Sequence, residues 1–344
     1  MLAEGHKEIH KAATSLCLLF CLLLLVCVSG DSSTAQTEIV KYQEVRRLMW
    51  TKFEIVAYGT ERPRLVEAAN AAFEEIDRLD RQMSNYLETS DLTFINRNAA
   101  YAEVTVEKEL FDLLKLALDY SRTTDDAFDI TVGPLMKAWG FFKGQGRLPE
   151  PKELKSVLAK TGYKHVRLNT AARTIRFDRE GVELDLGGIA KGYAVDKAAE
   201  ILRESGVTMA LITCGSSIYA IGAPPNQSFW RVDVSNPLDL ANPVTTIELK
   251  DNALSTSGCY EKIFKLDGKT YCHIMNPQTG YPIEEMLSAT VITPHGVDAE
   301  VFSKVLMVQG VAKAKNFVKR QKEIRAILCF RQPQSTVGTT KLNF

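Results

Sequence analysis

Hydrophobic and polar positions follow two different periods along the chain. Apolar residues at every third or fourth position are typical of an amphipathic helix, whereas strict alternation is typical of a half-buried strand. The helical period predicts helices over residues 64–83, 107–121, 151–160, 190–205 and 299–319, with a break at Gly310 in the last one. Alternation predicts strands over residues 52–58, 165–168, 174–177, 182–186, 209–213, 218–221, 230–234, 245–249, 288–292 and 325–330.

The order of these elements indicates the fold class. Strands and helices mix without the strict alternation of a doubly wound sheet, so the sequence predicts an α+β fold with mixed sheets and flanking helices. A single domain is predicted over residues 46–330, since no internal repeat or low-complexity linker divides it. Residues 31–45 read as a flexible leader, and residues 331–344 read as a loose polar tail.

The first 30 residues have the pattern of an export segment. Lys7 and Lys11 precede an uncharged apolar run over residues 16–28, which is shorter than the roughly 20 residues of a membrane-spanning helix. Small residues before Asp31 predict cleavage there, while lipid attachment at Cys27 or an uncleaved anchor stays open. We therefore expect an exported protein that is periplasmic or attached to the outer face of the inner membrane, with a membrane tether as an alternative.

Composition and cysteine spacing narrow the class of partner and of metal site. The chain of 344 residues has 42 basic and 42 acidic residues, and this balance argues against nucleic acid as a partner. Beyond the export segment four cysteines remain, and their spacing matches no zinc motif. Buried or free thiols are the favoured interpretation, with one disulfide left open for an oxidising compartment; the four are Cys214, Cys259, Cys272 and Cys329.

The stretch Asp185-Leu-Gly-Gly-Ile-Ala-Lys-Gly-Tyr-Ala-Val-Asp196 combines a predicted strand, two glycines and a helix start. The first N–H groups of a helix have no internal partner, and glycine allows the backbone to approach a phosphate closely. The stretch matches neither the dinucleotide-binding nor the P-loop motif. The sequence predicts an anion site here without identifying the anion.

Three further segments are unusually rich in Gly, Asp, Thr and Ser: residues 127–135 followed by 139–141, residues 254–261, and residues 273–282. Each alone has a simple structural explanation as a turn, a strand edge or a core aromatic. Together with the 185–196 stretch, and with Met49-Trp50-Thr51, Met83-Ser84-Asn85-Tyr86, Ser90 and Asn96, they closely resemble the ApbE family, the FAD:protein FMN transferases. The resemblance runs from about residue 49 to about residue 310.

This resemblance implies an activity, a cofactor and a partner. Members of the family are exported, often lipid-anchored, α+β proteins that bind FAD and usually use Mg²⁺. They transfer the FMN moiety of FAD to a threonine (or serine) hydroxyl of a partner flavoprotein and release AMP. The expected partner is an acceptor flavoprotein, such as an exported or membrane electron-transfer subunit.

The resemblance also assigns site residues. His273 is the expected acceptor of the hydroxyl proton, because the ordinary pKa of histidine is near neutrality, with a purely structural role as the alternative. Lys191 is expected to neutralise phosphate charge, and the Gly188 carbonyl and Glu300 are expected to bind the metal. The residues expected to line the FAD site are Met49, Tyr86, Ala127, Phe128, Asp129, Asp185, Lys191 and Ile274.

The chain departs from the family pattern at the metal segment. Glu300 stands where the family has Asp, and Lys304 stands where it has a threonine ligand. A protonated lysine cannot bind Mg²⁺, so magnesium dependence is in question; the Lys304 ammonium could instead touch the pyrophosphate. Asp298 could take the ligand role after a small shift. In addition, Trp50 replaces a usual glycine, and residues 215–217 replace a usual Gly-Gly-Asp.

The sequence leaves two other functions open as alternatives to the transferase. The chain could hold FAD without transferring it, if its metal site has eroded. It could also be a hydrolase that splits the FAD pyrophosphate with water as the acceptor.

Overall fold

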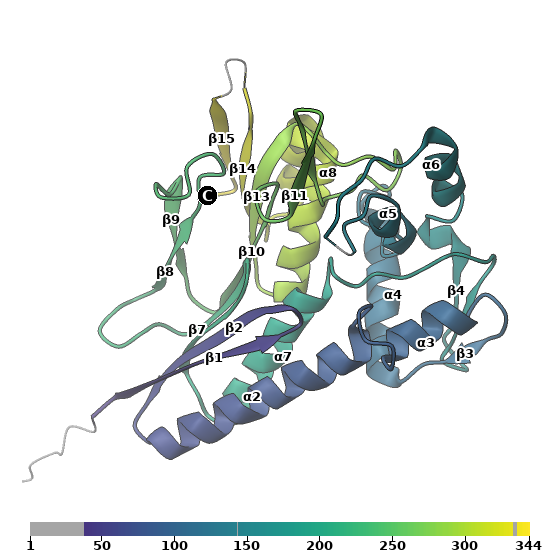
Figure 1. Cartoon of the computed structure of the whole chain (residues 1–344). Helices are drawn as coiled ribbons and strands as arrows, with labels where there is room; N and C mark the ends of the chain where they lie inside the picture. The colour runs from purple at the N-terminus through teal and green to yellow at the C-terminus, as the bar shows by residue number, and fades with distance from the viewer. Residues whose placement is uncertain (1–37, 143, 333–335) are drawn as a thin grey trace, which may run out of the picture. The chain divides into compact units, whose positions relative to one another are not determined.

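An eight-stranded antiparallel sheet runs through the unit formed by residues 39–344 (Figure 1). The computed structural model describes residues 38–142, 144–332 and 336–344, so the predicted export segment lies outside the described residues. In sheet order the strands are β1 (Val40–Leu48), β2 (Thr51–Gly59), β6 (Met209–Cys214), β7 (Ser217–Ile221), β10 (Asn252–Gly258), β13 (Met286–Thr293), β14 (Arg325–Arg331) and β15 (Val337–Leu342).

Three long helices pack against one face of this sheet: α2 (Arg62–Met83), α7 (Ala190–Glu204) and α8 (Gly296–Arg320). Phe53, Ile55 and Ala57 of β2 point into this layer and are fully buried. The intervening residues Val56 and Tyr58 pack on the opposite face, beneath the hairpin of β8 (Trp230–Val234) and β9 (Thr245–Leu249). The alternation that predicted β2 thus reflects burial against two different layers.

Shorter elements complete the fold. The helices are α3 (Asp91–Asn98), α4 (Lys108–Thr123), α5 (Gly133–Ala138) and α6 (Pro151–Leu158), with a 3-10 turn, η1 (Tyr163–His165). A three-stranded sheet contains β3 (Val104–Thr105), β5 (Thr174–Phe177) and β4 (Val166–Asn169), and a hairpin contains β11 (Ile263–Leu266) and β12 (Lys269–Cys272). The α+β prediction is confirmed. Among the described residues, no helix is both long and apolar enough for a membrane span.

The predictions of a flexible leader and of a loose polar tail were both wrong for the residues that the structure describes. Residues 40–45 belong to β1, which pairs with β2 along its whole length, rather than to a flexible leader. Residues 337–342 form β15, paired with β14, rather than a loose tail. Both are edge strands, which leave many side chains in solvent and are often polar, so their composition resembles that of a loop.

The predicted strand over residues 182–186 is also wrong. These residues are irregular, and the side chain of Asn96 takes the place of a partner strand. Its Nδ2 donates to the Leu184 carbonyl at 3.0 Å, and its Oδ1 accepts from the Leu184 N–H at 2.8 Å. Asn96 lies on α3, a helix that the sequence pattern did not predict.

Two glycines allow α7 and α8 to touch where they meet. A Cβ atom at Gly192 of α7 would lie 2.3 Å from the carbonyl oxygen of Gly296 and 2.6 Å from the Cβ of Glu300. Asp196, one turn later, accepts from the N–H groups of Gly296 and Val297 at 2.6 and 2.8 Å and so caps α8 from outside. This contact fixes the start of α8 relative to the 185–196 stretch.

We expect Gly192→Ala to destabilise the fold. Alanine is favoured over glycine in a helix by roughly 0.5–1 kcal/mol, but the overlap with a backbone carbonyl is an overpacking cost of about 1–3 kcal/mol. Urea unfolding should therefore show a lower free energy of unfolding than for wild type. Glu200→Ala, on the exposed face of the same helix, is the control and should change it by less than about 0.5 kcal/mol. An unchanged or raised midpoint for Gly192→Ala would rule out the tight contact.

Candidate active site

A cavity of about 340 Å³ lies where the four predicted motif segments meet. Its walls come from the β1–β2 turn, the residues after α2, the 127–136 segment, the start of α7, the loop after β10, the residues after β12, and α8. With the exception of the alternative ligand Asp298, every residue that the sequence assigned to a role lines it: Met49, Tyr86, Ala127, Phe128, Asp129, Asp185, Gly188, Lys191, His273, Ile274, Glu300 and also Lys304.

Two lysines share one buried carboxylate on the cavity wall. Oε1 of Glu300 lies 3.0 Å from Nζ of Lys191 and 2.6 Å from Nζ of Lys304. The Glu300 side chain is 1% exposed, while the two lysine side chains are 26% and 22% exposed. All three residues line the cavity, and the carboxylate is the most deeply buried of them.

The charges in this cluster depend on one another. Burial alone would raise the pKa of Glu300, but the ammonium groups of Lys191 and Lys304 outweigh it and the pKa is lowered. Burial would lower the pKa of Lys191, but Glu300 raises it. Burial, together with the Lys191 ammonium, leaves the pKa of Lys304 below its usual range despite Glu300. One carboxylate thus faces two lysines, and Glu261 adds a second negative charge that acts on both of them.

The residues present do not fit a magnesium site. Both oxygens of Glu300 are already used, because the two lysines occupy Oε1 while the hydroxyls of Ser217 and Ser255 donate to Oε2. Its backbone carbonyl accepts from Lys304 Nζ at 3.1 Å and from Ser303 Oγ at 2.9 Å. Mg²⁺ requires oxygen ligands at about 2.0–2.1 Å in a near-octahedral arrangement.

The alternative metal ligand is engaged elsewhere. Asp298 accepts a hydrogen bond from the hydroxyl of Tyr120 and does not line the cavity. Gly188 does lie in the wall, but a Cβ there would be 3.1 Å from the Phe128 ring and 3.4 Å from Cδ of Lys304, so its space is taken by these two side chains. Among the residues that the structure describes, no group of three His, Cys, Asp or Glu could hold a metal ion.

The two aspartates predicted to line the FAD site, Asp129 and Asp185, have different hydrogen-bond partners. Both oxygens of Asp129 are used internally, since Oδ1 accepts from the N–H and hydroxyl of Thr131 and Oδ2 accepts from the Tyr163 N–H. Asp129 therefore ties its own loop to η1. Asp185 accepts from the Gly187 N–H at 2.7 Å, which shapes the turn before α7. Burial raises the pKa of Asp185, while Gly187, Lys191 and Asn85 lower it.

Aromatic rings form the rim. The Tyr86 ring stacks on Phe142 at 4.7 Å and lies 5.4 Å from the Trp50 ring, whose residue is 74% exposed. Met49 and Trp50 form the β1–β2 turn with φ of 48° and 60°, the left-handed region that two-residue hairpin turns require. Glycine adopts this conformation freely and tryptophan does not, so Trp50 stands in a strained position beside the cavity.

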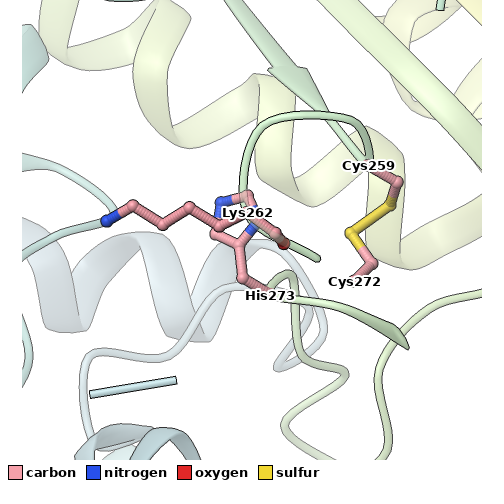
Figure 2. Close-up of a disulfide and its surroundings, with 4 residues drawn as sticks. All are labelled: Cys259, Lys262, Cys272 and His273. Carbon is pink, nitrogen blue, oxygen red and sulfur yellow. A yellow bond between two sulfur atoms is a disulfide. The ribbon is translucent and has the colours of Figure 1, made fainter. Parts of the chain in front are cut away.

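His273 follows directly after a disulfide. Cys259 and Cys272 are bonded, and Figure 2 shows the bridge together with Lys262 and His273. The disulfide that the sequence left open therefore exists in the structure, and Cys214 and Cys329 are buried free thiols. The bridge closes the loop that carries Glu261 and Lys262, both of which line the cavity.

The contacts of His273 determine its tautomer. Its Nδ1 lies 3.1 Å from the carbonyl oxygen of Lys262, and its backbone N–H donates to the same oxygen at 3.1 Å. A carbonyl can only accept, so Nδ1 carries the proton and Nε2 is left with a free lone pair. His273 is thus held in the form that can accept a proton at Nε2.

We expect His273 to remain neutral across the physiological range. Burial, followed by the positive charges of Lys304 and Lys262, lowers its pKa to about 4. An NMR titration of the ring C2 proton, assigned with His273→Gln, should therefore show protonation only as the pH falls toward 4. Lys304→Met should raise this midpoint, since it removes one of the charges. A midpoint near 6.5 in the wild type would contradict the buried, cation-flanked setting.

Several cavity residues had no role in the sequence prediction. Glu261 and Asn85 stood inside recognised segments without one, and Lys262 lay one residue past such a segment. Asn85 Oδ1 is buried and has no hydrogen-bond partner among the described residues. Ser217 and Ser255 hold Glu300 from β7 and β10, strands whose proximity to α8 the sequence does not reveal.

Comparison with known proteins points to the same family as the sequence motifs do. The model of the ApbE family matches residues 49–328. The FAD:protein FMN transferase of Salmonella typhimurium is 31% identical over 313 residues, covering 89% of each chain, and that of Treponema pallidum is 27% identical, covering 92% of each. The crystal structure of the ApbE protein from Thermotoga maritima has a TM-score of 0.79 at 30% identity, over 88% of this chain and 97% of that one. The flavin transferase from Vibrio cholerae has a TM-score of 0.76 at 27% identity, over 89% and 97%.

Proposed function

The chain belongs to the ApbE family, and from this premise we propose that it transfers the FMN moiety of FAD to a hydroxyl of an acceptor protein. The observation that carries the proposal is the cavity itself. It places two ammonium groups, a histidine with a free Nε2 and a set of aromatic rings around one space. Phosphoryl transfer depends on positioning the reactants and on neutralising charge on the phosphate oxygens, and these groups suit both tasks.

The lining indicates how FAD would be held. Lys191 and Lys304 present positive charge for the pyrophosphate. Tyr86 and Phe128 offer flat apolar faces, which suit a ring system. The buried carbonyl oxygen of Asn85 has no partner in the part of the chain that the structure describes, and a ring N–H of the ligand would satisfy it.

The transfer step follows from these positions. The oxygen of a threonine or serine side chain on the acceptor attacks the phosphorus that bears riboflavin, and the bond from that phosphorus to the AMP phosphate breaks. Nε2 of His273 takes the hydroxyl proton, and AMP leaves with the electron pair of the broken bond. The products are an FMN phosphodiester on the acceptor and AMP.

We further propose that the chain is exported and acts on an exported or membrane-bound flavoprotein. The uncharged run over residues 16–28 behind two lysines supports export, with cleavage, lipid attachment and an uncleaved anchor as the possible fates of that segment. The disulfide between Cys259 and Cys272 also supports it, because disulfides persist in oxidising compartments such as the periplasm.

Intact mass spectrometry of an acceptor tests the transfer directly. Purified protein is mixed with FAD and an acceptor domain that the Vibrio cholerae flavin transferase labels under the same conditions. We expect the acceptor to gain the mass of one FMN group, with one AMP released per label. Release of free FMN without labelling would indicate a hydrolase, and tight FAD binding without any turnover would indicate a binding protein; either result overturns the proposal.

A further inference from the structure

We propose that Lys304 takes the place of a divalent cation, so that its ammonium group contacts the pyrophosphate and the reaction proceeds without metal. This inference rests on the proposed function. It starts from the finding that Glu300 has no free oxygen for Mg²⁺, because two lysines and two serines occupy its carboxylate. Lys304 thus stands where the family has a metal ligand, and its ammonium group already lies against Glu300.

The geometry holds Lys304 at the cavity. Residues 300 and 304 are four apart on α8, a spacing at which side chains are neighbours on the helix surface. The ammonium lies 2.6 Å from the Glu300 carboxylate and 3.1 Å from the carbonyl of the same residue. The aliphatic part passes over Gly188, where an added Cβ would lie 3.4 Å from Cδ. Two hydrogen bonds therefore fix the ammonium, and packing against Gly188 holds the aliphatic part beside the motif predicted to bind phosphate.

The placement of the positive charges favours an anion beside Lys191 and Lys304. Lys191 and Lys304 together carry two positive charges, Glu300 carries one negative charge, and Glu261 adds a second negative charge near both lysines. The remaining ionisable side chains on the cavity wall are the acids Asp80, Asp129, Asp185 and Glu261, the base Lys262, and His273 and Tyr86, which are neutral at pH 7. Asp129 is turned toward its own loop, and Asp80 accepts from the Met49 N–H beneath the β1–β2 turn. The three lysines are therefore matched by Glu300, Glu261 and Asp185, and the cavity has no net excess of charge. Two of the ammonium groups nevertheless lie side by side on one oxygen of Glu300, and a pyrophosphate bound beside them would relieve their mutual repulsion.

The location also suits the chemistry. Preorganised positive groups lower the barrier of phosphoryl transfer by stabilising charge on the phosphate oxygens, and a fixed ammonium can supply part of this effect. Lys304 is oriented by a carboxylate that is itself held by two serine hydroxyls, Ser217 and Ser255. Little rearrangement of Lys304 would therefore be needed when FAD binds. In the proposed complex its ammonium touches the substrate, which makes Lys304 a catalytic residue.

The transfer assay with and without metal tests the inference. We expect wild-type protein to label the acceptor at the same rate in excess EDTA as in Mg²⁺. Labelling that requires Mg²⁺ would overturn the role of Lys304 while leaving the transferase function intact. Absence of labelling in both conditions would instead count against the proposed function, so the two failures are distinguishable.

Binding measurements provide a second readout. Lys304→Met should weaken FAD binding in EDTA by about tenfold to a hundredfold, the size of a lost charge-assisted hydrogen bond. The same variant should bind riboflavin, which has no phosphate, as tightly as wild type does, which would show that the cavity is still folded. Lys313→Met, on the exposed side of α8, is the matched control and should bind both like wild type. Unchanged FAD affinity in Lys304→Met would overturn the inference, as would equal losses for both ligands.

Discussion

Replacing Glu300 with alanine is expected to lower the free energy of unfolding by about 3–5 kcal/mol, the typical cost of removing one partner from a buried ion pair. The variant would leave the ammonium groups of Lys191 and Lys304 close together, with no carboxylate between them. It would also leave the hydroxyls of Ser217 and Ser255 without their shared acceptor. Urea unfolding followed by circular dichroism measures the loss.

A double variant separates charge from packing. Glu300→Ala combined with Lys304→Met removes one of the two repelling charges, so it should recover part of the stability lost in the single variant. Glu67→Ala, at an exposed position of α2, is the surface control and should change the free energy of unfolding by less than about 0.5 kcal/mol. A Glu300→Ala protein as stable as wild type would show that the cluster is not the ion pair described above.

Replacing His273 with glutamine is expected to reduce the rate of FMN transfer by about 10²–10⁴, the usual contribution of a general base. Glutamine can still donate to the Lys262 carbonyl, so the loop should keep its position. FAD affinity should change little, because the groups expected to hold the pyrophosphate are untouched. Single-turnover labelling of the acceptor gives the rate, and flavin fluorescence gives the affinity.

The outcome distinguishes a catalytic from a structural histidine. His165→Gln is the control, because His165 pairs with Asp178 and does not line the cavity; it should transfer FMN like wild type. If His273→Gln loses FAD affinity and rate together, the residue supports the site without taking the proton. If it keeps the wild-type rate, another group is the base.

Most of the fold was predictable because buried apolar residues recur in the sequence with the period of a helix or of a strand. The alternation in β2 and the apolar stripe of α2 reflect contact with the core, and the break predicted at Gly310 is real, with φ of 70° inside α8. Strands β1 and β15 were missed because edge strands expose much of their surface. The false strand at residues 182–186 arose because one side chain, Asn96, satisfies an irregular backbone.

The candidate site was predictable as a set of segments but not as a set of contacts. The motifs identified residues that line one cavity, because each motif is a short continuous stretch of sequence. The sequence showed that Lys304 replaces a ligand, but not that Lys191 and Lys304 share Glu300. That arrangement depends on how α7 crosses α8, which Gly192 and Gly296 determine through backbone contact. Likewise, cysteine spacing left the Cys259–Cys272 bond open, because connectivity depends on three-dimensional proximity.

A crystal structure of the protein with FAD, grown in the presence of EDTA, is the most direct test of the account. We predict that the pyrophosphate lies within hydrogen-bond distance of Nζ of Lys191 and Nζ of Lys304, with the flavin ring against Tyr86 and the riboflavin phosphorus accessible from Nε2 of His273. A complex in which FAD binds away from this cavity, or in which its phosphates avoid both lysines, would contradict the account.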